Sequence, residues 1–481
     1  MPWKVMVAAL ALGEDEVSRQ AAFARLESFG FLRPRRIANW PGPQPELDRP
    51  LGIVAGDVTR SLPPLRVETA NLGCAACHAG VTYDAEGLPR PEEVWLGLPN
   101  TSIDLEAYTW TVYRSLQRAM EDPDHLLATV ERLFPDISLR ERKTLRRFVL
   151  PRIAARLAEL EAGLDAPTVF SNGSPGLTNG VAALKLKLGL LSEGVPAEEF
   201  GFTSIPDLGD RPLRSALLWD SAYVRPGVDR EAVGERGEPV AEGRAEQAHI
   251  VAFFTVPTMG MEPGAVVGAV PGVAAVLESL ADYRPPPFPG PIEEMAAVRG
   301  GEVYAGHCAS CHGEYTVEAG RPVLDRFPNR LVVQGEMGSD PLRWQAMDAE
   351  LVAAIRRSGY GREIDAATTG GYVATPLTGL WATAPYLHNG SVPTLWHLMH
   401  PAERPRRFAV GGHRLDFERV GIALHEAADG EWVYPGGWQP FSTPRIYDTR
   451  EPGRSNTGHE REFEALPETD KAALLEFLKL L

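Results

Sequence analysis

All four cysteines of the chain lie in two Cys-X-X-Cys-His pentapeptides, at residues 74–78 and 308–312. Because the chain has only 11 histidines in 481 residues, the chance that both cysteine pairs precede a histidine is about one in two thousand. Two thiols at this spacing can each bond one vinyl group of a porphyrin, while the following imidazole binds the iron. The spacing therefore predicts two covalently bound haem c groups. Their attachment points and iron ligands would be Cys74, Cys77 and His78, and Cys308, Cys311 and His312.

Two other uses of paired cysteines fit this sequence less well. The two pairs of an all-cysteine zinc site usually lie roughly 15–20 residues apart, whereas almost half of the chain separates Cys77 from Cys308. A thioredoxin-like dithiol follows a buried strand in a βαβ unit. Neither motif here follows a run rich in valine or isoleucine.

The composition restricts the partners that we expect. The net charge of −16, from 64 acidic and 48 basic residues, disfavours nucleic acid and anionic membranes because both would be repelled. No apolar run approaches the roughly 18 residues of a membrane helix, so no transmembrane segment is expected. The expected partner is a small redox protein or another electron donor or acceptor.

The N-terminus gives a weak indication of where the protein resides. Lys4 and the apolar residues 5–12 resemble a short signal-peptide core, although the acidic Glu14 follows almost at once. Covalent haem attachment in bacteria takes place outside the cytoplasmic membrane. We therefore predict an exported, periplasmic protein, mainly from the haem motifs.

Hydrophobic periodicity predicts the helices that would position the motifs. These helices are expected at residues 14–29, 103–121, 124–134, 137–161 with a break at Pro151, 178–190, 240–255, 270–283, 291–306 and 467–481. The proline-rich residues 281–291 indicate a linker between an N-terminal haem-binding region, 1–290, and a C-terminal cytochrome c domain, 291–481. The expected fold is mainly α, with two cytochrome-c-like haem units, long irregular loops and insertions.

Gly300 lies inside the helix expected before the second motif, where glycine costs about 1 kcal/mol relative to alanine. We predict that the C-terminal helix crosses it closely, because only glycine leaves room for such a contact.

Three segments resemble the di-haem c-type cytochrome family, most closely its rubber-oxygenase-like proteins and more distantly its bacterial di-haem cytochrome c peroxidases. These segments are the PPPFPGP linker, PYLHNGSVPTLWHL at 385–398 and RSNTGHE at 454–460. With the haem motifs, the resemblance covers about residues 74–481 and leaves the first 70 residues outside it.

The resemblance implies His459 as the distal ligand of the C-terminal haem. Met399 is the rival, because peroxidase relatives use a methionine soon after the PYLH-type segment. His388 and His400 are among the remaining candidates. For His388 the resemblance implies either a structural role near that haem or ligation. Two imidazoles would give a low-spin iron suited to electron relay.

The N-terminal haem has no obvious sixth ligand in the sequence. Met120, Met259, Met261 and His249 fit packing at least as well as ligation. An open iron would bind peroxide or dioxygen, whereas a closed iron can only pass electrons.

Trp219 matches a position where rubber-oxygenase-like proteins place aromatic residues around the active haem. Leu218 replaces a second aromatic residue, and the phenylalanine expected near Gly234 is absent, so the resemblance does not extend to all the residues expected for oxidative cleavage of a polyisoprene chain. The predicted function is haem-based electron transfer by a di-haem oxidoreductase, with an open N-terminal haem and an electron-relay C-terminal haem. The alternatives are a pure electron carrier with both haems six-coordinate, and a haem peroxidase or dioxygenase acting on an unknown substrate.

Overall fold

The computed structural model describes residues 1–481 except 62–64, 164–170, 193, 238–243, 259–262 and 319. Helices account for 39% and strands for 18% of the residues, so the prediction of a mainly α fold was wrong. The strands escaped prediction because most are short and lack the alternation of buried and exposed residues that marks a half-buried strand. In β2, Ile53–Arg60, only the first residue is buried.

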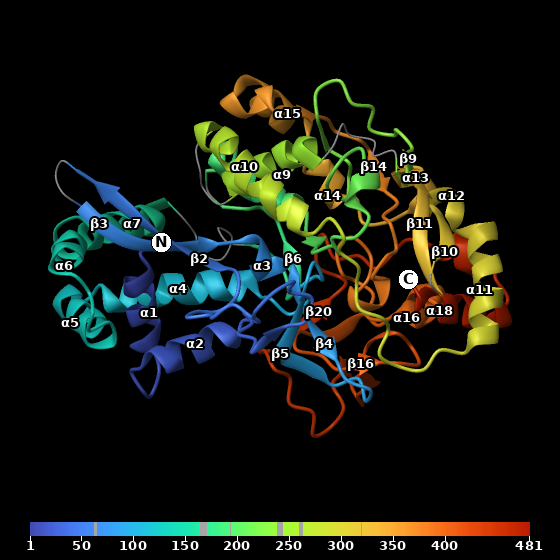
Figure 1. Cartoon of the computed structure of the whole chain (residues 1–481), viewed down its shortest axis with the longest axis horizontal. Helices are drawn as coiled ribbons and strands as arrows, with labels where there is room; N and C mark the ends of the chain where they lie inside the picture. The colour runs from blue at the N-terminus through green and yellow to red at the C-terminus, as the bar shows by residue number, and fades with distance from the viewer. Residues whose placement is uncertain (62–64, 164–170, 193, 238–243, 259–262, 319) are drawn as a thin grey trace.

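The N-terminal lobe is a group of helices on the left of Figure 1. Its helices are α1 Trp3–Ala11, α2 Arg19–Glu27, α4 Leu105–Ala119, α5 Pro123–Leu133, α6 Leu139–Thr144 and α7 Leu150–Gly163. Helix α1 contains most of the apolar run that resembles a signal-peptide core, and it packs against α2, α4 and α5 with almost every side chain buried. Within this helix, Lys4 Nζ donates hydrogen bonds to Glu68 and Glu141 at 2.7 and 2.9 Å.

The predicted break near Pro151 is confirmed. A π-helical turn, Leu145–Val149, separates α6 from α7, and the amide of Leu150 donates to the carbonyl of Leu145. Proline has no amide hydrogen to donate, and its ring clashes with the preceding turn of an α-helix. The wider turn accommodates both constraints.

The first Cys-X-X-Cys-His motif lies between two small sheets. The hairpin of β2 and β3, Leu65–Leu72, precedes the single-turn helix α3, Cys74–Cys77, and β4, Ala79–Tyr83, follows it. Strand β4 pairs with β5, Pro89–Leu96, in a three-stranded sheet. The prediction of two cytochrome-c-like units was therefore wrong for this motif, because no crossing helix pair encloses it in the part of the chain that the structure describes.

A second group of helices covers the centre of the molecule, at the top of Figure 1. It contains α8 Gly180–Lys187, α9 Arg244–Thr258 and α10 Pro263–Ser279, with α9 in contact with both of the others. Two strands of the same region pair with strands from beyond residue 291. Strand β8, Tyr223–Val224, pairs with β13, Asp365–Ala366, and β9, Gly234–Glu235, pairs with β11, Arg321–Phe327.

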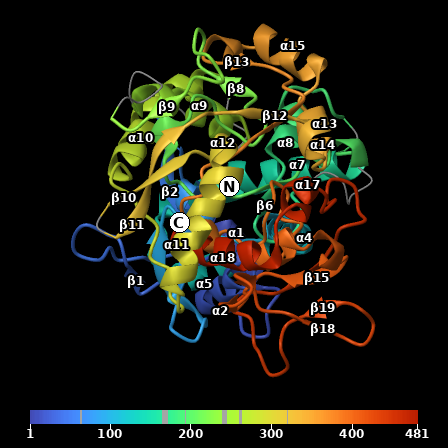
Figure 2. The same ribbon diagram turned by 90° about the vertical axis from the view of Figure 1, so that its right-hand side faces the viewer.

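The second motif lies in a cytochrome-c-like arrangement of helices. Helix α11, Glu294–His307, leads into the short α12, Ala309–His312, and α18, Glu468–Leu478, crosses α11 (Figure 2). A Cβ atom on Gly300 would lie 2.0 Å from the carbonyl oxygen of Ala473. The predicted close crossing at Gly300 is confirmed.

The remaining strands and α-helices are short and are distributed over several parts of the molecule. They are β1 Arg36–Ile37, β6 Leu177–Thr178, β7 Thr203–Ser204, β10 Glu314–Glu318, β12 Leu331–Val333, α13 Gln334–Met337, α14 Leu342–Gln345, α15 Ala349–Arg357, β14 Gly371–Val373, α16 Leu395–Met399, β15 Arg407–Val410, β16 Leu415–Asp416, β17 Gly421–Ile422, β18 His425–Glu426, β19 Trp432–Val433, β20 Arg445–Asp448 and α17 Glu460–Glu464. None of the helices in the described part of the chain has the length and hydrophobicity needed to span a bilayer.

Candidate functional site

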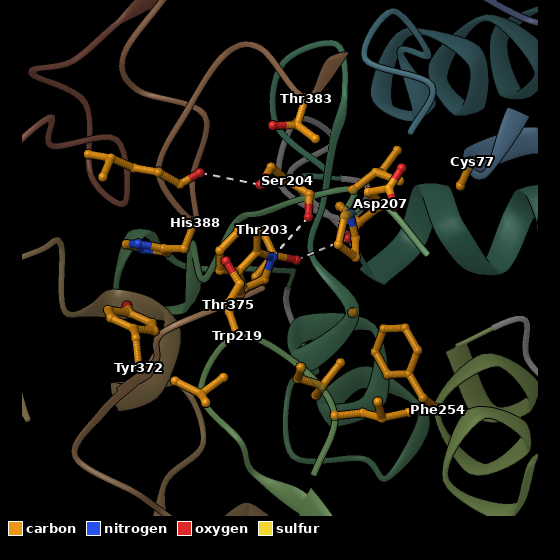
Figure 3. A pocket seen from close by; sticks show the side chains of 18 of the residues that line it. Cys77, Thr203, Ser204, Asp207, Trp219, Phe254, Tyr372, Thr375, Thr383 and His388 are labelled. Carbon is orange, nitrogen blue, oxygen red and sulfur yellow. Dashed lines mark hydrogen bonds between the residues drawn. The ribbon is translucent and has the colours of Figure 1, made fainter. Parts of the chain in front are cut away.

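Both Cys-X-X-Cys-His motifs open into one cavity of about 1370 Å³. This volume exceeds the roughly 300–1,000 Å³ of a pocket for a single small ligand. The sequence-predicted residues on its wall are Cys74, Cys77, His78, Trp219, Cys308, Cys311, His312, His388 and His459. Figure 3 shows part of this wall, with Trp219 and Ser204 between Cys77 and His388 in the view.

The backbone of the first motif is fixed by hydrogen bonds. His78 donates its amide to the carbonyl of Cys74 at 2.8 Å, which closes the turn. The buried Asn100 donates its amide to the carbonyl of Cys77 at 2.7 Å and its side-chain nitrogen to the carbonyl of Ala76 at 3.0 Å. Asn100 was missed by sequence reasoning, since nothing in its spacing connects it to the motif.

The second motif presents His312 with a defined orientation. The amide of His312 donates to Cys308 at 2.9 Å, and its Nδ1 bonds the carbonyl of Thr375 at 2.7 Å. A carbonyl can only accept, so the ring proton lies on Nδ1 and Nε2 remains available to bind iron.

His459 faces His312 across the cavity. The two rings are nearly parallel, 23° apart, and their centroids are separated by 6.2 Å. Metal–imidazole bonds are about 2 Å long and the centroid lies about 1.1 Å behind the ligating nitrogen, so two rings on opposite sides of one metal have centroids about 6.3 Å apart. The pair fits two axial ligands of one haem iron.

The rival ligands lie elsewhere. Met399 is 1% exposed, packs in the hydrophobic core of the C-terminal unit and is not part of the cavity wall. His400 stacks on Trp396 and bonds Glu468 through Nε2 at 2.8 Å. Of the candidates for the distal ligand, the structure brings His459 opposite His312 and places Met399 and His400 away from the cavity.

A buried arginine holds the loop that carries His459. Arg404 donates to the carbonyls of Leu398 and Gly458, both at 2.9 Å, and to the carboxylate of Glu460 at 2.9 Å. That carboxylate in turn accepts from the amide of Gly458. The loop places His459 in the left-handed region, with φ of 67°. Sequence reasoning missed Arg404, because it lies more than fifty residues before this loop and belongs to no motif.

Burial keeps the imidazoles of His78, His312 and His459 neutral. It lowers the pKa of His459 to about 3 and the pKa of His78 to about 4. The charge of Arg211 lowers the pKa of His78 further, while the nearby carbonyl of Pro206 opposes this without reaching hydrogen-bond geometry. Burial also lowers the pKa of His312. A neutral imidazole is the form that binds a metal.

The cysteines do not fit the two alternative chemistries. Burial raises the pKa of the Cys77 and Cys308 thiols to about 12, whereas a reactive dithiol needs a lowered pKa. No group of three or more potential metal-binding side chains gathers anywhere in the described residues, so the four thiols do not form a tetrahedral zinc site. Four unpaired cysteines beside a large cavity fit thioether attachment of haem.

The side of the cavity near the first motif has few possible iron ligands. Among the described wall residues between 72 and 280, His78 is the only histidine and there is no methionine. Met120 packs against the core of the N-terminal lobe, and His249 bonds Glu363 at 2.7 Å. Met259 and Met261 lie outside the described residues. The wall here comes instead from apolar side chains of α8, α9 and α10.

Trp219 and His388 belong to the wall between the motifs. Trp219 Nε1 donates to the carbonyl of Ser204 at 3.0 Å, and the amide of Ser204 donates to the carbonyl of His388 at 2.6 Å. The His388 ring stacks on Tyr372 with centroids 4.1 Å apart. Burial lowers the pKa of His388 to about 3, so its ring is neutral at physiological pH.

Stability should decrease as the pH falls, because histidines away from the motifs are buried in the neutral form. Burial lowers the pKa of His413 to about 4, and its Nε2 lies 3.1 Å from the hydroxyl of Tyr83. The unfolded chain takes up this proton below about pH 6.5, so His413 destabilises the fold by roughly 2 kcal/mol at pH 5. Denaturant unfolding at pH 7.5 and pH 5 should show a smaller difference for His413→Gln than for the wild type. An equal difference would contradict this assignment.

A family model described as RoxA-like, cytochrome c-like, matches residues 371–409. This segment includes His388, Met399 and Arg404 but neither cysteine motif and not His459. It therefore supports the resemblance to rubber-oxygenase-like cytochromes in the C-terminal unit.

Two uncharacterized proteins of Sinorhizobium fredii are also similar. One, y4iM, is 35% identical over 204 residues, which are 39% of this chain and 46% of that protein. The other, y4iJ, is 30% identical over 263 residues, 41% of each chain. The chain thus spans less than half the length of these curated relatives. The match to the RoxA-like cytochrome c model, together with the site geometry, supports a haem-binding cytochrome c with a redox function and covalently attached haem c.

Proposed function

We propose that this chain is an exported di-haem c-type cytochrome and oxidoreductase. His78 would hold the haem at the first motif without a second side-chain ligand, and His312 and His459 would together hold the haem at the second motif, which would serve as an electron relay. The observation that carries this proposal is the single cavity, in which His312 has a partner imidazole 6.2 Å away and His78 has none among the described wall residues between 72 and 280.

A short route of backbone segments and hydrogen bonds, with one non-bonded contact at His78, runs between the two proximal histidines. The carbonyl of Pro206 lies beside His78, and two residues earlier Ser204 accepts the indole hydrogen bond of Trp219 at 3.0 Å. The carbonyl of Trp219 accepts from Val373 at 2.8 Å. Two residues later, Thr375 accepts from His312. This route supports electron exchange between the two haems, with Trp219 at its centre.

The surroundings of the first motif support chemistry as well as electron transfer. Haem bound there supplies the iron position that takes up peroxide or dioxygen. The apolar side chains of α8, α9 and α10 would exclude water from this position. Trp219 and the neutral His388 provide an indole and an imidazole on the same cavity wall. A peroxidase-like or oxygenase-like reaction follows, with electrons exchanged through the second haem and a small redox protein or other periplasmic donor or acceptor.

One observation favours the second candidate, an electron carrier with both irons closed. His388 is a buried histidine of the cavity wall that binds neither iron in the favoured assignment. If it were to bind the iron above His78, neither haem would have an open position.

The number and spin state of the haems test this proposal. A pyridine haemochrome assay should give two covalent haems per chain, and one after either double replacement, Cys74→Ser with Cys77→Ser or Cys308→Ser with Cys311→Ser. Electron paramagnetic resonance of the oxidised protein should show one high-spin and one low-spin haem. Fewer than two haems would overturn the di-haem proposal, and two low-spin signals would leave the electron carrier.

A further inference from the structure

Arg214 places an uncompensated positive charge on the cavity wall. It follows the short 3-10 turn Arg211–Leu213 and lines the cavity. Its Nη2 donates to the carbonyl of Leu218 at 3.0 Å. Its Nε is buried and has no hydrogen-bond partner among the residues that the structure describes.

The carboxylates nearest in sequence to Arg214 have other partners. Asp207 accepts from the hydroxyl of Tyr283 and from the amide of Gly209. Asp210 accepts from the hydroxyl of Thr378. Asp220, the next carboxylate along the chain, is bound by the buried Arg343, whose Nη2 lies 3.1 Å from its Oδ1. These acidic groups are all engaged with other residues.

A buried guanidinium without a counter-ion is strongly unfavourable. Arginine cannot escape the cost by losing its proton at physiological pH, and burial of an unpaired charge is among the most destabilising features a fold can carry. Burial lowers the pKa of Arg214 to about 10, and no carboxylate of the described residues counteracts that effect. The site is therefore built for an anion that the polypeptide itself does not provide.

The chemistry of the cavity indicates which anion this is. Haem is an apolar macrocycle with two carboxylates, and a guanidinium binds a carboxylate through two parallel hydrogen bonds. Arg211, one turn before Arg214, acts electrostatically on the ring of His78, which places this segment beside the first motif. We propose that Arg214 binds a propionate carboxylate of the haem attached at the first motif.

This inference rests on the proposed function, because it requires a haem at Cys74 and Cys77. It adds a role for the positive charge of Arg214. A cation beside the haem favours the reduced iron over the more positive oxidised iron, so Arg214 raises the reduction potential of the first haem. The same contact holds the propionate ionised by lowering its pKa.

The test compares the holoprotein with Arg214→Gln and Arg214→Lys by spectroelectrochemical titration of both haems between pH 5.5 and pH 8. In Arg214→Gln the equilibrium between reduced and oxidised first haem should shift about tenfold toward oxidised, which is 59 mV for one electron. Its potential should also become pH-dependent, because the propionate then titrates in this range. Arg214→Lys should recover part of the wild-type potential and part of its independence of pH, because lysine keeps the positive charge. For the same reason it remains available for measurement if Arg214→Gln does not fold.

A matched control removes an arginine that is paired with carboxylates outside the cavity. Arg445 donates to Glu106 at 3.3 Å and is not part of the cavity wall. Arg445→Gln should leave both potentials unchanged.

Three outcomes would overturn the inference. The first is an unchanged potential of the first haem in Arg214→Gln with both haems retained. The second is a shift confined to the second haem. The third is a wild-type potential that varies with added chloride or phosphate, which would mean that Arg214 binds an exchangeable solvent anion. Wild-type protein with fewer than two covalent haems would instead contradict the proposed function itself.

Discussion

Replacing His459 by glycine should convert the haem at the second motif from low-spin to high-spin. The ring of His459 is nearly parallel to that of His312, with centroids 6.2 Å apart, and removing it leaves only one axial imidazole on that iron. About half of the total haem iron should therefore change spin state in the paramagnetic resonance spectrum of the oxidised protein. Added imidazole should restore the low-spin signal, since the vacated position has room for the ring it lost.

Met399→Leu is the matched control for this experiment. Met399 packs in the core rather than on the cavity wall, and exchange of methionine for leucine keeps the volume and costs less than about 1.5 kcal/mol. Its spectrum should match the wild type. An unchanged spectrum in His459→Gly, together with a second high-spin haem in Met399→Leu, would identify Met399 as the ligand instead.

The sequence was most informative for features that depend only on residues close together in the chain. Covalent attachment of haem needs two thiols and an imidazole within five residues, so both motifs are visible without any fold. The helices were found for a similar reason. Residues 103–121 and 124–134 were expected to be helical, and α4 and α5 occupy Leu105–Ala119 and Pro123–Leu133. Each has an apolar face at helical spacing, and an aspartate caps the start of each.

The surroundings of the first motif were not predictable in the same way. Its neighbours β3 and β4 belong to two separate small sheets, and β3 has intermediate or exposed side chains on both faces over most of its length. Such strands are stabilised by backbone hydrogen bonds to partner strands, and no sequence pattern predicts which strands will pair. The expectation of a second cytochrome-c-like unit came from the repeated motif, which specifies haem attachment but not the fold around it.

The residues that orient the site could not be predicted from the sequence either. Asn100 binds the carbonyl of Ala76 from twenty-four positions away, and Arg404 binds the carbonyl of Gly458 from fifty-four positions away. Each is a single polar side chain that acquires its hydrogen-bond partner only when folding brings distant segments of the chain into contact. Sequence reasoning therefore found the groups that would touch haem and missed those that hold them.

Replacing Gly300 by alanine should destabilise the C-terminal unit by about 2 kcal/mol. The added Cβ would lie 2.0 Å from the carbonyl oxygen of Ala473 and 2.8 Å from Cβ of Phe477, so α11 and α18 would have to move apart. Overpacking of this kind costs about 1–3 kcal/mol, and the contact here is with rigid backbone, which favours the upper end. The better helix propensity of alanine returns only about 1 kcal/mol. Denaturant unfolding of the holoprotein, followed by helical circular dichroism, measures the difference.

Gly306 supplies the control within the same helix. A Cβ atom there would meet nothing within 4 Å, so Gly306→Ala gains helix propensity without a clash and should stabilise the protein by up to about 1 kcal/mol. Opposite signs for two identical substitutions, six positions apart on α11, can come only from what lies against each residue. If both variants were stabilised, the helices would not cross at Gly300, and the close packing of α18 against the helix that precedes the second haem motif would be contradicted.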